Sequence, residues 1–308
     1  MKGLITTVVG SYPVQPTKAD LLKSLHGKDP YVDCIAEAVK DQIKAGVDVI
    51  SDGQTRADMI RLVTQKLKGF RDDGKGRIRV VGKIEPKDEI VTKDFLYAKR
   101  FADDKALVKG ILTGPCTIAS FLQNEHYKDP KELVLDLAGA IALEAKRLSA
   151  HGAAMVQLDE PIFSAGGDLE LGRDTTGTVF DAVDVPLILH VCGDAAPAYP
   201  ALLDFPVDIL DHEFSTNPRL LEEINEYNID KRIGYGCVDS SSEKVESVAV
   251  IRKRIENALE YFKPEDLLID PDCGLRNIGR ESAFAKLKNM CEAVKEIKEP
   301  PRKRHRRR

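Results

Sequence analysis

The stretch "LILHVCGD" (187–194) is an apolar run that ends in two metal-binding side chains, His190 and Cys192. Side chains alternate between the two faces of a strand, so residues two apart point to the same face. Glu213 ends a second apolar run, and Cys273 ends a third. Histidine nitrogen, cysteine sulfur and carboxylate oxygen are the donors that zinc binds, and four of them complete a tetrahedron. The sequence therefore predicts one zinc ion held by His190, Cys192, Glu213 and Cys273.

The donors of this predicted site carry more negative charge than a divalent ion carries positive charge, because both thiolates and the carboxylate are anionic. Such a zinc ion is poorly suited to activating water, but it can accept a further thiolate in place of its weakest ligand, Glu213. Coordination deprotonates a substrate thiol whose free pKa is about 8.5, and the anionic surroundings keep its sulfur nucleophilic. The predicted reaction is the alkylation of a zinc-bound thiol.

Each donor taken alone also has a structural explanation. A single cysteine is most often a small buried residue, an isolated histidine is most often a core residue, and Glu213 could cap a helix that starts near Asn217. Packing explains the coincidence of these donors at three strand ends less well than a metal does. Other residues compete for ligand roles. His212 is expected to point away from the lumen, and Cys116 and Cys237 are reserve ligands at the same rim.

Eight short segments rich in Val, Ile and Leu alternate with amphipathic segments along the chain. The predicted strands are 4–10, 47–51, 107–114, 154–160, 186–191, 207–213, 232–238 and 267–273. The clearest predicted helices are 129–152, 217–228, 241–262 and 281–298. Eight strand–helix units in 308 residues predict an α/β fold of the (β/α)8 TIM-barrel type. In such barrels the carboxyl ends of the strands carry the chemistry, and the candidate residues lie at those ends.

One segment interrupts this rhythm. Residues 76–101 contain two alternating, β-like runs on either side of 85–88, which predicts a β-hairpin excursion after the second strand. We expect a single catalytic barrel over residues 1–299. The last residues, 300–308, are densely basic and are expected to form a disordered tail.

The composition, with 43% hydrophobic and 31% charged residues, is typical of a globular protein with a sizeable core. No apolar run approaches the ~20 residues of a membrane span, and the first residues lack the pattern of a signal peptide. The six cysteines lie far apart, which favours free thiols over a disulfide framework. We therefore expect a cytoplasmic enzyme without membrane association and, at a net charge of −4, without a nucleic-acid partner.

Motifs spread over nearly the whole chain resemble one known family. They are "TTVVGSYP", "SDGQTRADM", "ILTGPCTI", "VQLDEP", "HVCGD", "DHEFS", "GYGCVD" and "IDPDCGLRN". Taken together, they resemble the catalytic carboxyl-terminal barrel of cobalamin-independent methionine synthase, and the short, single-barrel archaeal members in particular. The resemblance implies the same four zinc ligands that the strand ends predict.

The resemblance also implies homocysteine as the thiol substrate. Three consecutive residues would bind its carboxylate: Val9, Gly10 and Ser11. Its ammonium would lie near Asp159. Members of the family usually have Glu where this chain has Gln54, so the contact there is uncharged. Asp159, helped by Asp52 or Glu160, would then have to provide the charge pairing.

Departures from the folate-using members bear on the methyl donor. Those members carry a Trp after "TGP" that stacks on the pterin and a His after the seventh strand that protonates the folate. This chain has no Trp, and it has Ser240 and Ser241 in that loop. Folate-using members also have an additional amino-terminal barrel half. A methyl-cobalt corrinoid needs no proton, because cobalt leaves as Co(I). The sequence therefore predicts methylcobalamin or a methylated corrinoid protein as methyl donor, with the corrinoid protein as a partner.

Other functions stay open at this point. The same scaffold could methylate another small thiol such as coenzyme M from methylcobalamin, or it could be a folate-dependent methionine synthase. Homocysteine has an ammonium that coenzyme M lacks, so Asp159 distinguishes these substrates. A non-enzymatic alternative is a zinc-stabilised barrel that binds a corrinoid protein or nucleic acid through its basic tail.

Overall fold

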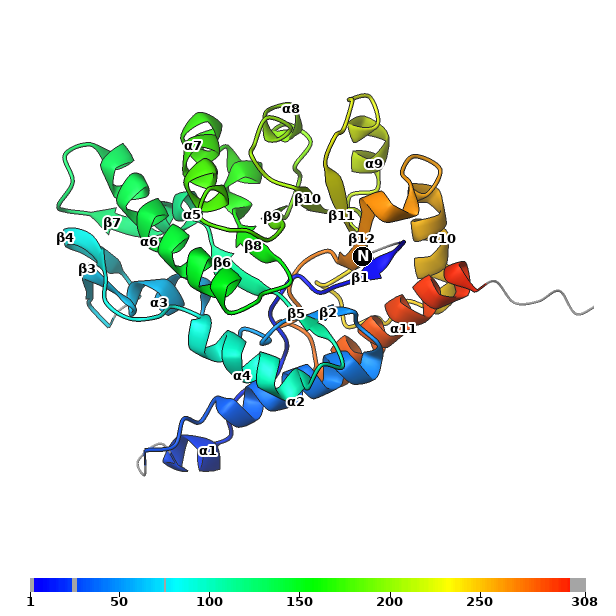
Figure 1. Cartoon of the computed structure of the whole chain (residues 1–308), viewed down its shortest axis with the longest axis horizontal. Helices are drawn as coiled ribbons and strands as arrows, with labels where there is room; N and C mark the ends of the chain where they lie inside the picture. Colours follow the sequence, from blue (N-terminus) through cyan, green and yellow to red (C-terminus); the bar gives the residue numbers. More distant parts are fainter. Residues whose placement is uncertain (1–2, 24–26, 75, 300–308) are drawn as a thin grey trace, which may run out of the picture.

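The structure, a computed structural model, describes residues 3–23, 27–74 and 76–299. The predicted basic tail, residues 300–308, lies outside the described residues. Parallel strands occupy the centre of the molecule, and helices surround them (Figure 1). Among the described residues, no helix combines the length and the apolar composition that a membrane span requires.

The central strands pair in the order β1, β12, β11, β10, β9, β8, β6, all in parallel. Their bounds are β1 (Ile5–Thr6), β6 (Gly110–Thr113), β8 (Val156–Asp159), β9 (Leu187–Val191), β10 (Ile209–Glu213), β11 (Arg232–Val238) and β12 (Leu267–Pro271). A second parallel pair joins β2 (Val49–Ile50) to β5 (Leu107–Val108).

These two sheets meet at both of their ends. A parallel bridge between Thr7 and Val49 links the chain after β1 to β2. At the other end, β5 and β6 are two parts of the predicted third strand, separated only by Lys109. The pairings thus lead back to β1, which makes the α/β arrangement barrel-like. Each of the eight predicted strand segments contains at least one of these strands.

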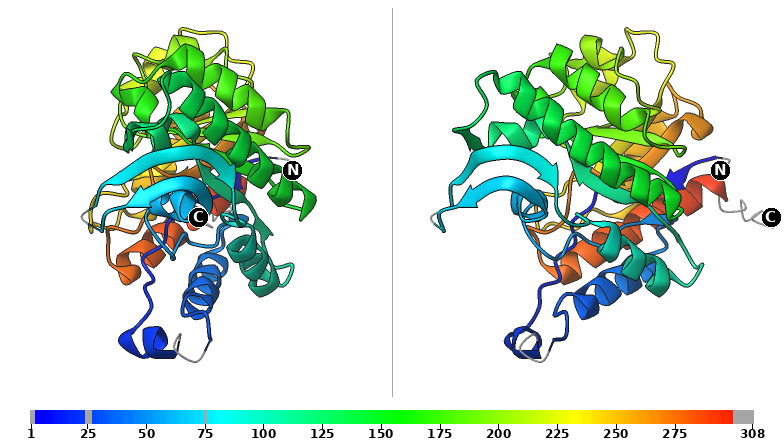
Figure 2. Two further views of the ribbon diagram at one scale, coloured as in Figure 1. Left: turned by 90° about the vertical axis from the view of Figure 1, so that its left-hand side faces the viewer. Right: turned by 60° about the vertical axis from the view of Figure 1, so that its left-hand side comes forward.

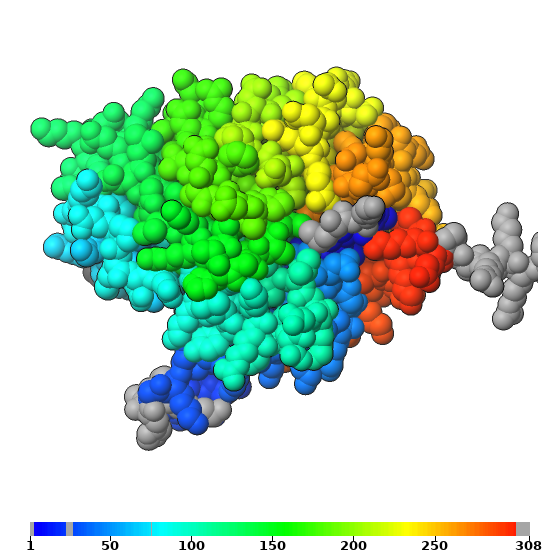
Figure 3. All heavy atoms as spheres, in the orientation of Figure 1, coloured from blue at the N-terminus to red at the C-terminus, as the bar shows by residue number. Residues whose placement is uncertain are grey.

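The helices follow the strands and pack on their outer faces (Figure 1). The longer ones are α2 (Val32–Ala45), α4 (Thr92–Ala102), α6 (Pro130–Ala150), α7 (Leu169–Phe180), α10 (Val248–Ala258) and α11 (Arg280–Lys298). The shorter ones are α1 (Lys18–Lys23), α3 (Met59–Thr64), α5 (Pro115–Ser120), α8 (Tyr199–Leu202), α9 (Arg219–Ile224) and two 3-10 turns, η2 (Pro161–Ala165) and η3 (Pro264–Asp266). α1 projects from the body of the molecule (Figure 3).

Helix boundaries follow local hydrogen bonds. α6 begins as predicted, where the Asp129 side chain accepts a hydrogen bond from the Lys131 N–H. The helix predicted over 241–262 begins later, after Ser247, whose hydroxyl caps α10. The reason is that the Asp239 carboxylate accepts hydrogen bonds from both the N–H and the hydroxyl of Ser241, which holds that residue in a turn.

The excursion after the second barrel strand differs from the prediction. β3 (Leu67–Asp72) pairs antiparallel with β4 (Ile78–Pro86), and β4 pairs in parallel with β7 (Leu122–Asn124). This small sheet lies on the outside of the molecule (Figure 2). The second predicted β-like run forms α4 instead. The N–H groups at the start of a helix have no partner within the helix, and here buried Glu144 accepts hydrogen bonds from those of Ile90, Val91 and Thr92.

The interior of the barrel changes from apolar to polar along the strands. Six inward-facing apolar side chains form one cluster: Ile5, Val49, Met155, Ile188, Ile209 and Leu268. Two residues further along four of these strands, the side chains on the same face are Gln157, His190, Asp211 and Asp270, and all four are buried. The period-two pattern therefore directs polar groups into the barrel directly below the carboxyl ends of the strands.

Candidate metal and substrate site

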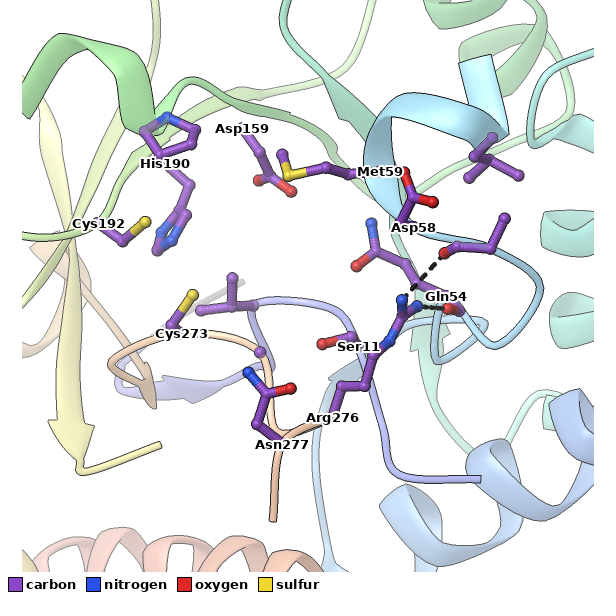
Figure 4. A pocket seen from close by; sticks show the side chains of 15 residues that line it. Ser11, Gln54, Asp58, Met59, Asp159, His190, Cys192, Cys273, Arg276 and Asn277 are labelled. Atoms are coloured by element: carbon purple, nitrogen blue, oxygen red, sulfur yellow. Dashed lines mark hydrogen bonds between the residues drawn. The ribbon is translucent and has the colours of Figure 1, made fainter. Parts of the chain in front are cut away.

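A cavity of about 290 Å³ lies at the carboxyl ends of the strands (Figure 4). Its lining comes from the ends of β1, β2, β8, β9 and β12, together with the start of α3. The residues with functional groups are Ser11, Gln54, Asp58, Met59, Asp159, His190, Cys192, Cys273, Arg276 and Asn277. This is the end of a barrel at which active sites form, and the size suits a small ligand.

Three of the four predicted metal ligands converge on one side of this cavity. The ligand atoms of His190, Cys192 and Cys273 all lie within 4.8 Å of one another. A tetrahedral zinc with Zn–S bonds of about 2.3 Å has sulfur atoms about 3.8 Å apart, so the spacing is within about 1 Å of that arrangement. The buried Nε2 of His190 has no hydrogen-bond partner among the described residues. An unpaired imidazole nitrogen facing two thiols is a donor set that fits zinc.

Asp211 fixes the orientation of the His190 ring. The Nδ1 atom of His190 lies 3.1 Å from Oδ2 of Asp211, and both side chains are buried. Burial disfavours the imidazolium, but the Asp211 carboxylate outweighs it and raises the pKa of His190 well above its usual value. Such a carboxylate–histidine pair sets the tautomer that presents Nε2 to a metal. Asp211 was not among the residues predicted from the sequence, although its spacing from Ile209 places it on the inner face of β10.

The two thiols interact with each other. The hydrogen bond with Cys192 and burial raise the pKa of Cys273 above its usual value, against the opposing effect of the His190 ring. Coordination would reverse this direction, because a bound cation deprotonates its thiol ligands. Figure 4 shows both sulfur atoms beside the His190 imidazole.

Glu213, the fourth predicted ligand, is not in the cluster of ligand atoms that the described residues form. One of its carboxylate oxygens accepts a hydrogen bond of 3.3 Å from the Thr216 hydroxyl. The turn that follows β10 is held by Asp272, which accepts hydrogen bonds from the Ser215 and Thr216 hydroxyls. These contacts keep Glu213 at the end of β10 but beside Thr216, so the structure brings together three of the four predicted ligands.

The competing ligand candidates also lie outside the cluster. His212 is buried on the other face of β10, where Nδ1 lies 3.0 Å from the Val191 carbonyl oxygen and burial lowers the pKa of His212 to about 4. Its ring packs edge-on against Tyr199. Cys116 and Cys237 are both buried, and burial raises the pKa of each thiol.

The predicted substrate contacts divide into two groups. Val9, Ser11, Gln54 and Asp159 line the cavity. Gly10 and Asp52 are not among its described lining residues, because Gly10 packs under Gln54 and the Asp52 carboxylate accepts a hydrogen bond from the Gln54 N–H. A Cβ atom added to Gly10 would lie 2.6 Å from Oε1 of Gln54, so a larger residue at this position would displace the Gln54 side chain.

Hydrogen bonds between loops position Gln54, whose backbone has a φ of 43°. Arg276 donates hydrogen bonds from its guanidinium to the carbonyl oxygens of Gln54 and Ala57 (Figure 4). The Tyr12 N–H donates to the carbonyl oxygen of Gly53 over 2.9 Å. Arg276 therefore ties the loop after β12, which carries Cys273, to the loop after β2. Nothing in the spacing of the sequence indicated this contact between residues more than 200 positions apart.

A hydrogen bond from Gln157 positions the Asp159 carboxylate. Its Oδ1 accepts a hydrogen bond of 2.7 Å from Nε2 of Gln157. Burial raises the pKa of Asp159, while the charge of His190 and the hydrogen bond from Gln157 oppose that rise. A buried carboxylate facing a cavity is a site for a cationic group of a ligand.

Comparisons with known proteins agree over nearly the full length. A family model described as "Cobalamin-independent synthase, Catalytic domain" matches residues 4–296. A protein named methionine synthase from Methanocaldococcus jannaschii is 43% identical, and the match covers 96% of this chain and 100% of the relative. The methionine synthase of Methanothermobacter marburgensis is 40% identical with the same coverage.

Solved structures share the fold. A B12-independent methionine synthase from Shewanella sp. W3-18-1, solved with selenomethionine, superposes with a TM-score of 0.83. That match has 21% sequence identity and covers 96% of this chain and 98% of that one. At this identity the likeness shows the fold alone.

The matched family corrects the methyl donor that the sequence predicted. A synthase family described as independent of cobalamin does not take its methyl group from methylcobalamin or from a methylated corrinoid protein. The corrinoid cofactor and the corrinoid-protein partner are therefore wrong. The prediction rested on three differences from the folate-using members: the missing Trp, the presence of Ser240 and Ser241, and the additional barrel half of those members. All three concern the binding of folate, and the loss of folate contacts says nothing about cobalt.

Proposed function

The chain belongs to the cobalamin-independent methionine synthase family, and on that basis we propose that it transfers a methyl group to the thiol of homocysteine in a zinc-dependent reaction that yields methionine. The observation that carries the proposal is the convergence of His190, Cys192 and Cys273 on a cavity that also contains the buried carboxylate of Asp159. We further propose that residues 1–299 form one catalytic (β/α)8 barrel.

His190, Cys192 and Cys273 would hold the zinc ion. Bound zinc supplies positive charge that deprotonates a coordinated thiol and leaves its sulfur nucleophilic. Asp211 contributes by keeping the Nδ1 of His190 occupied, which leaves Nε2 for coordination. Glu213 stays the predicted fourth ligand and the one that gives way to substrate, and its contact with Thr216 supports a weak hold on the metal.

The remaining groups orient the amino acid. Asp159 pairs with the substrate ammonium, and the backbone and hydroxyl of the Val9–Ser11 segment bind its carboxylate. Both groups line the same cavity as the two thiols, so the substrate sulfur faces Cys192 and Cys273 when the amino-acid end is bound. Burial of Asp159 and His190 places these groups in a medium of low dielectric constant, which strengthens their charge interactions.

Calorimetry on zinc-loaded protein tests the proposal. We expect homocysteine to bind with release of a proton, measured in buffers that differ in their ionisation enthalpy, and binding to be lost when zinc is removed by a chelator. The thiol-sulfonate coenzyme M, which has no ammonium, is the control and should bind more weakly. Equal binding of the two thiols would exclude homocysteine as the preferred substrate. A turnover assay then measures methionine formed from homocysteine and methyltetrahydrofolate, a methyl donor without cobalt.

A further inference from the structure

Lys109 is a buried lysine that the proposed chemistry does not use. It separates β5 from β6, and its side chain is among the largest that are fully buried. Lysine is almost never fully buried unless its charge is paired, because desolvation of an ammonium is costly. Burial lowers the pKa of Lys109, while the carboxylates of Asp211, Asp270 and Asp159 oppose that change. A lysine in this place needs an explanation beyond packing.

The ammonium of Lys109 has a specific partner. Its Nζ donates a hydrogen bond of 2.5 Å to Oε1 of Gln157, a side chain that is itself buried. The two ends of a Gln amide have nearly the same shape, so hydrogen bonds decide which end points where. An ammonium can only donate, so Lys109 holds the carbonyl end of the amide on its own side.

The amino end of Gln157 then reaches two groups at the floor of the cavity. Nε2 donates to Oδ1 of Asp159 over 2.7 Å and to the carbonyl oxygen of Val9 over 2.9 Å. Both of these are acceptors, so a reversed amide would place its oxygen against two other oxygens. Asp159 and Val9 line the cavity, whereas Lys109 and Gln157 are not among its described lining residues.

We propose that Lys109 is a positioning residue that determines substrate specificity: through the Gln157 amide it aims the Asp159 carboxylate at the ammonium of the substrate. This inference rests on the proposed function, because it assigns that ammonium to homocysteine. Lys109 touches no reacting atom. Its effect reaches the substrate through two hydrogen bonds that begin beneath the cavity floor.

Binding of two thiols to the zinc-loaded, full-length Lys109→Met variant tests the proposal. One thiol is homocysteine, and the other is its desamino analogue, which has the same carboxylate and thiol but no ammonium. We expect the dissociation constant for homocysteine to rise about tenfold or more, and that for the analogue to change little. In turnover, the KM for homocysteine should rise while kcat is largely kept, which is not the result of a general loss of structure.

Two further variants make the experiment specific. Gln157→Leu should reproduce the selective loss, and it serves as the test if Lys109→Met does not fold. Lys286→Met is the matched control. Lys286 is equally buried and its Nζ lies 2.6 Å from a Glu246 oxygen, but it belongs to α11, outside the cavity. Its replacement should leave the preference for homocysteine over the analogue unchanged.

Asp159→Asn separates the failure of this inference from that of the proposed function. If Asp159→Asn keeps the preference for homocysteine, the ammonium contact is wrong, and the proposed substrate falls with it. If Asp159→Asn loses the preference but Lys109→Met and Gln157→Leu keep it, only the role of Lys109 is refuted. An equal weakening of both thiols in Lys109→Met and Gln157→Leu would also overturn the inference, because it would show a structural role.

Discussion

Replacement of Asp211 by asparagine should weaken zinc binding without removing a metal ligand. The Asp211 carboxylate contacts Nδ1 of His190 at 3.1 Å, and both side chains are about 2% exposed, so solvent screens this contact little. Asparagine has nearly the same shape and can still accept the hydrogen bond through its Oδ1. What it lacks is the charge that favours a strongly donating imidazole.

The size of the effect follows from that single difference. Hydrogen bonds to charged groups contribute ~1.5–3 kcal/mol and neutral ones ~0.5–1.5 kcal/mol, so the variant loses about 1–2 kcal/mol. This corresponds to zinc affinity about 5- to 30-fold weaker. Outer partners of metal-binding histidines typically contribute 10–100-fold to affinity, which overlaps this range.

Proton competition determines the pH at which to measure. In metal-free protein the Asp211 carboxylate raises the pKa of His190, so protons compete with zinc for the ring up to a higher pH than they would for a free imidazole. Zinc affinity should therefore rise with pH. The ion pair stabilises the metal-free fold fully below the unfolded pKa of about 6.5, and this contribution is lost as pH rises through the folded value. Alkaline pH removes the competition from the comparison.

The assay is competition for zinc against a chelator of known affinity, for the wild type and for Asp211→Asn. Asp270→Asn is the control, because Asp270 is also buried in the interior but makes no hydrogen bond to His190 among the described contacts. We expect its effect on affinity to be the smaller one. Wild-type affinity in Asp211→Asn at alkaline pH would refute the idea that this carboxylate orients and activates the ligand.

Three other outcomes are expected. Cys273→Ser should lose zinc and homocysteine binding, whereas Cys237→Ala should retain zinc in metal analysis, because Cys237 lies outside the ligand cluster. The Glu213→Gln variant should retain zinc through the three remaining donors. Loss of zinc in this variant would show that Glu213 is an essential ligand. Burial raises the pKa of Glu160 from 4.5 to about 7. Between these two pH values the folded protein binds more protons than the unfolded chain. The free energy of unfolding therefore falls as pH rises through this range, by up to about 3 kcal/mol. Denaturant unfolding of Glu160→Gln should lack this fall, and an unchanged pH dependence would contradict it.

The sequence contains enough information to place the central strands and to bring together three of the four predicted metal donors. Alternation puts His190 and Cys192 on one face, and parallel strands end at the same edge, which brings Cys273 to them. These are local rules, since each needs only the spacing within one strand and the common direction of the strands. The same rules place Asp211 inside the barrel, and a stricter use of them would have found it.

Contacts between distant segments decide what the sequence analysis missed. Alternation directs Glu213 inward as well, yet the hydrogen bonds that Asp272 makes to the following turn leave it beside Thr216. The predicted β-like run after Asp88 alternates like a strand, but Glu144, from another helix, caps its later part as α4. Neither Asp272 nor Glu144 is near its partner in the chain, so spacing alone could not reveal these effects.

The polar interior links the stability of the barrel to its chemistry. Asp159, Asp211 and Asp270 are buried together with Lys109. Burial, together with the nearby charge of Asp211, raises the pKa of Asp270 well above its usual value. An apolar layer at this level, like that of the six side chains below it, would avoid the cost of removing these carboxylates from water. The acidic groups instead place negative charge around the ring of His190 and the floor of the cavity. A cation at the thiol cluster would offset that charge. The buried carboxylates therefore make the metal-free barrel less stable, and the same carboxylates favour the binding of a metal ion and of a substrate with an ammonium group at the mouth of the barrel.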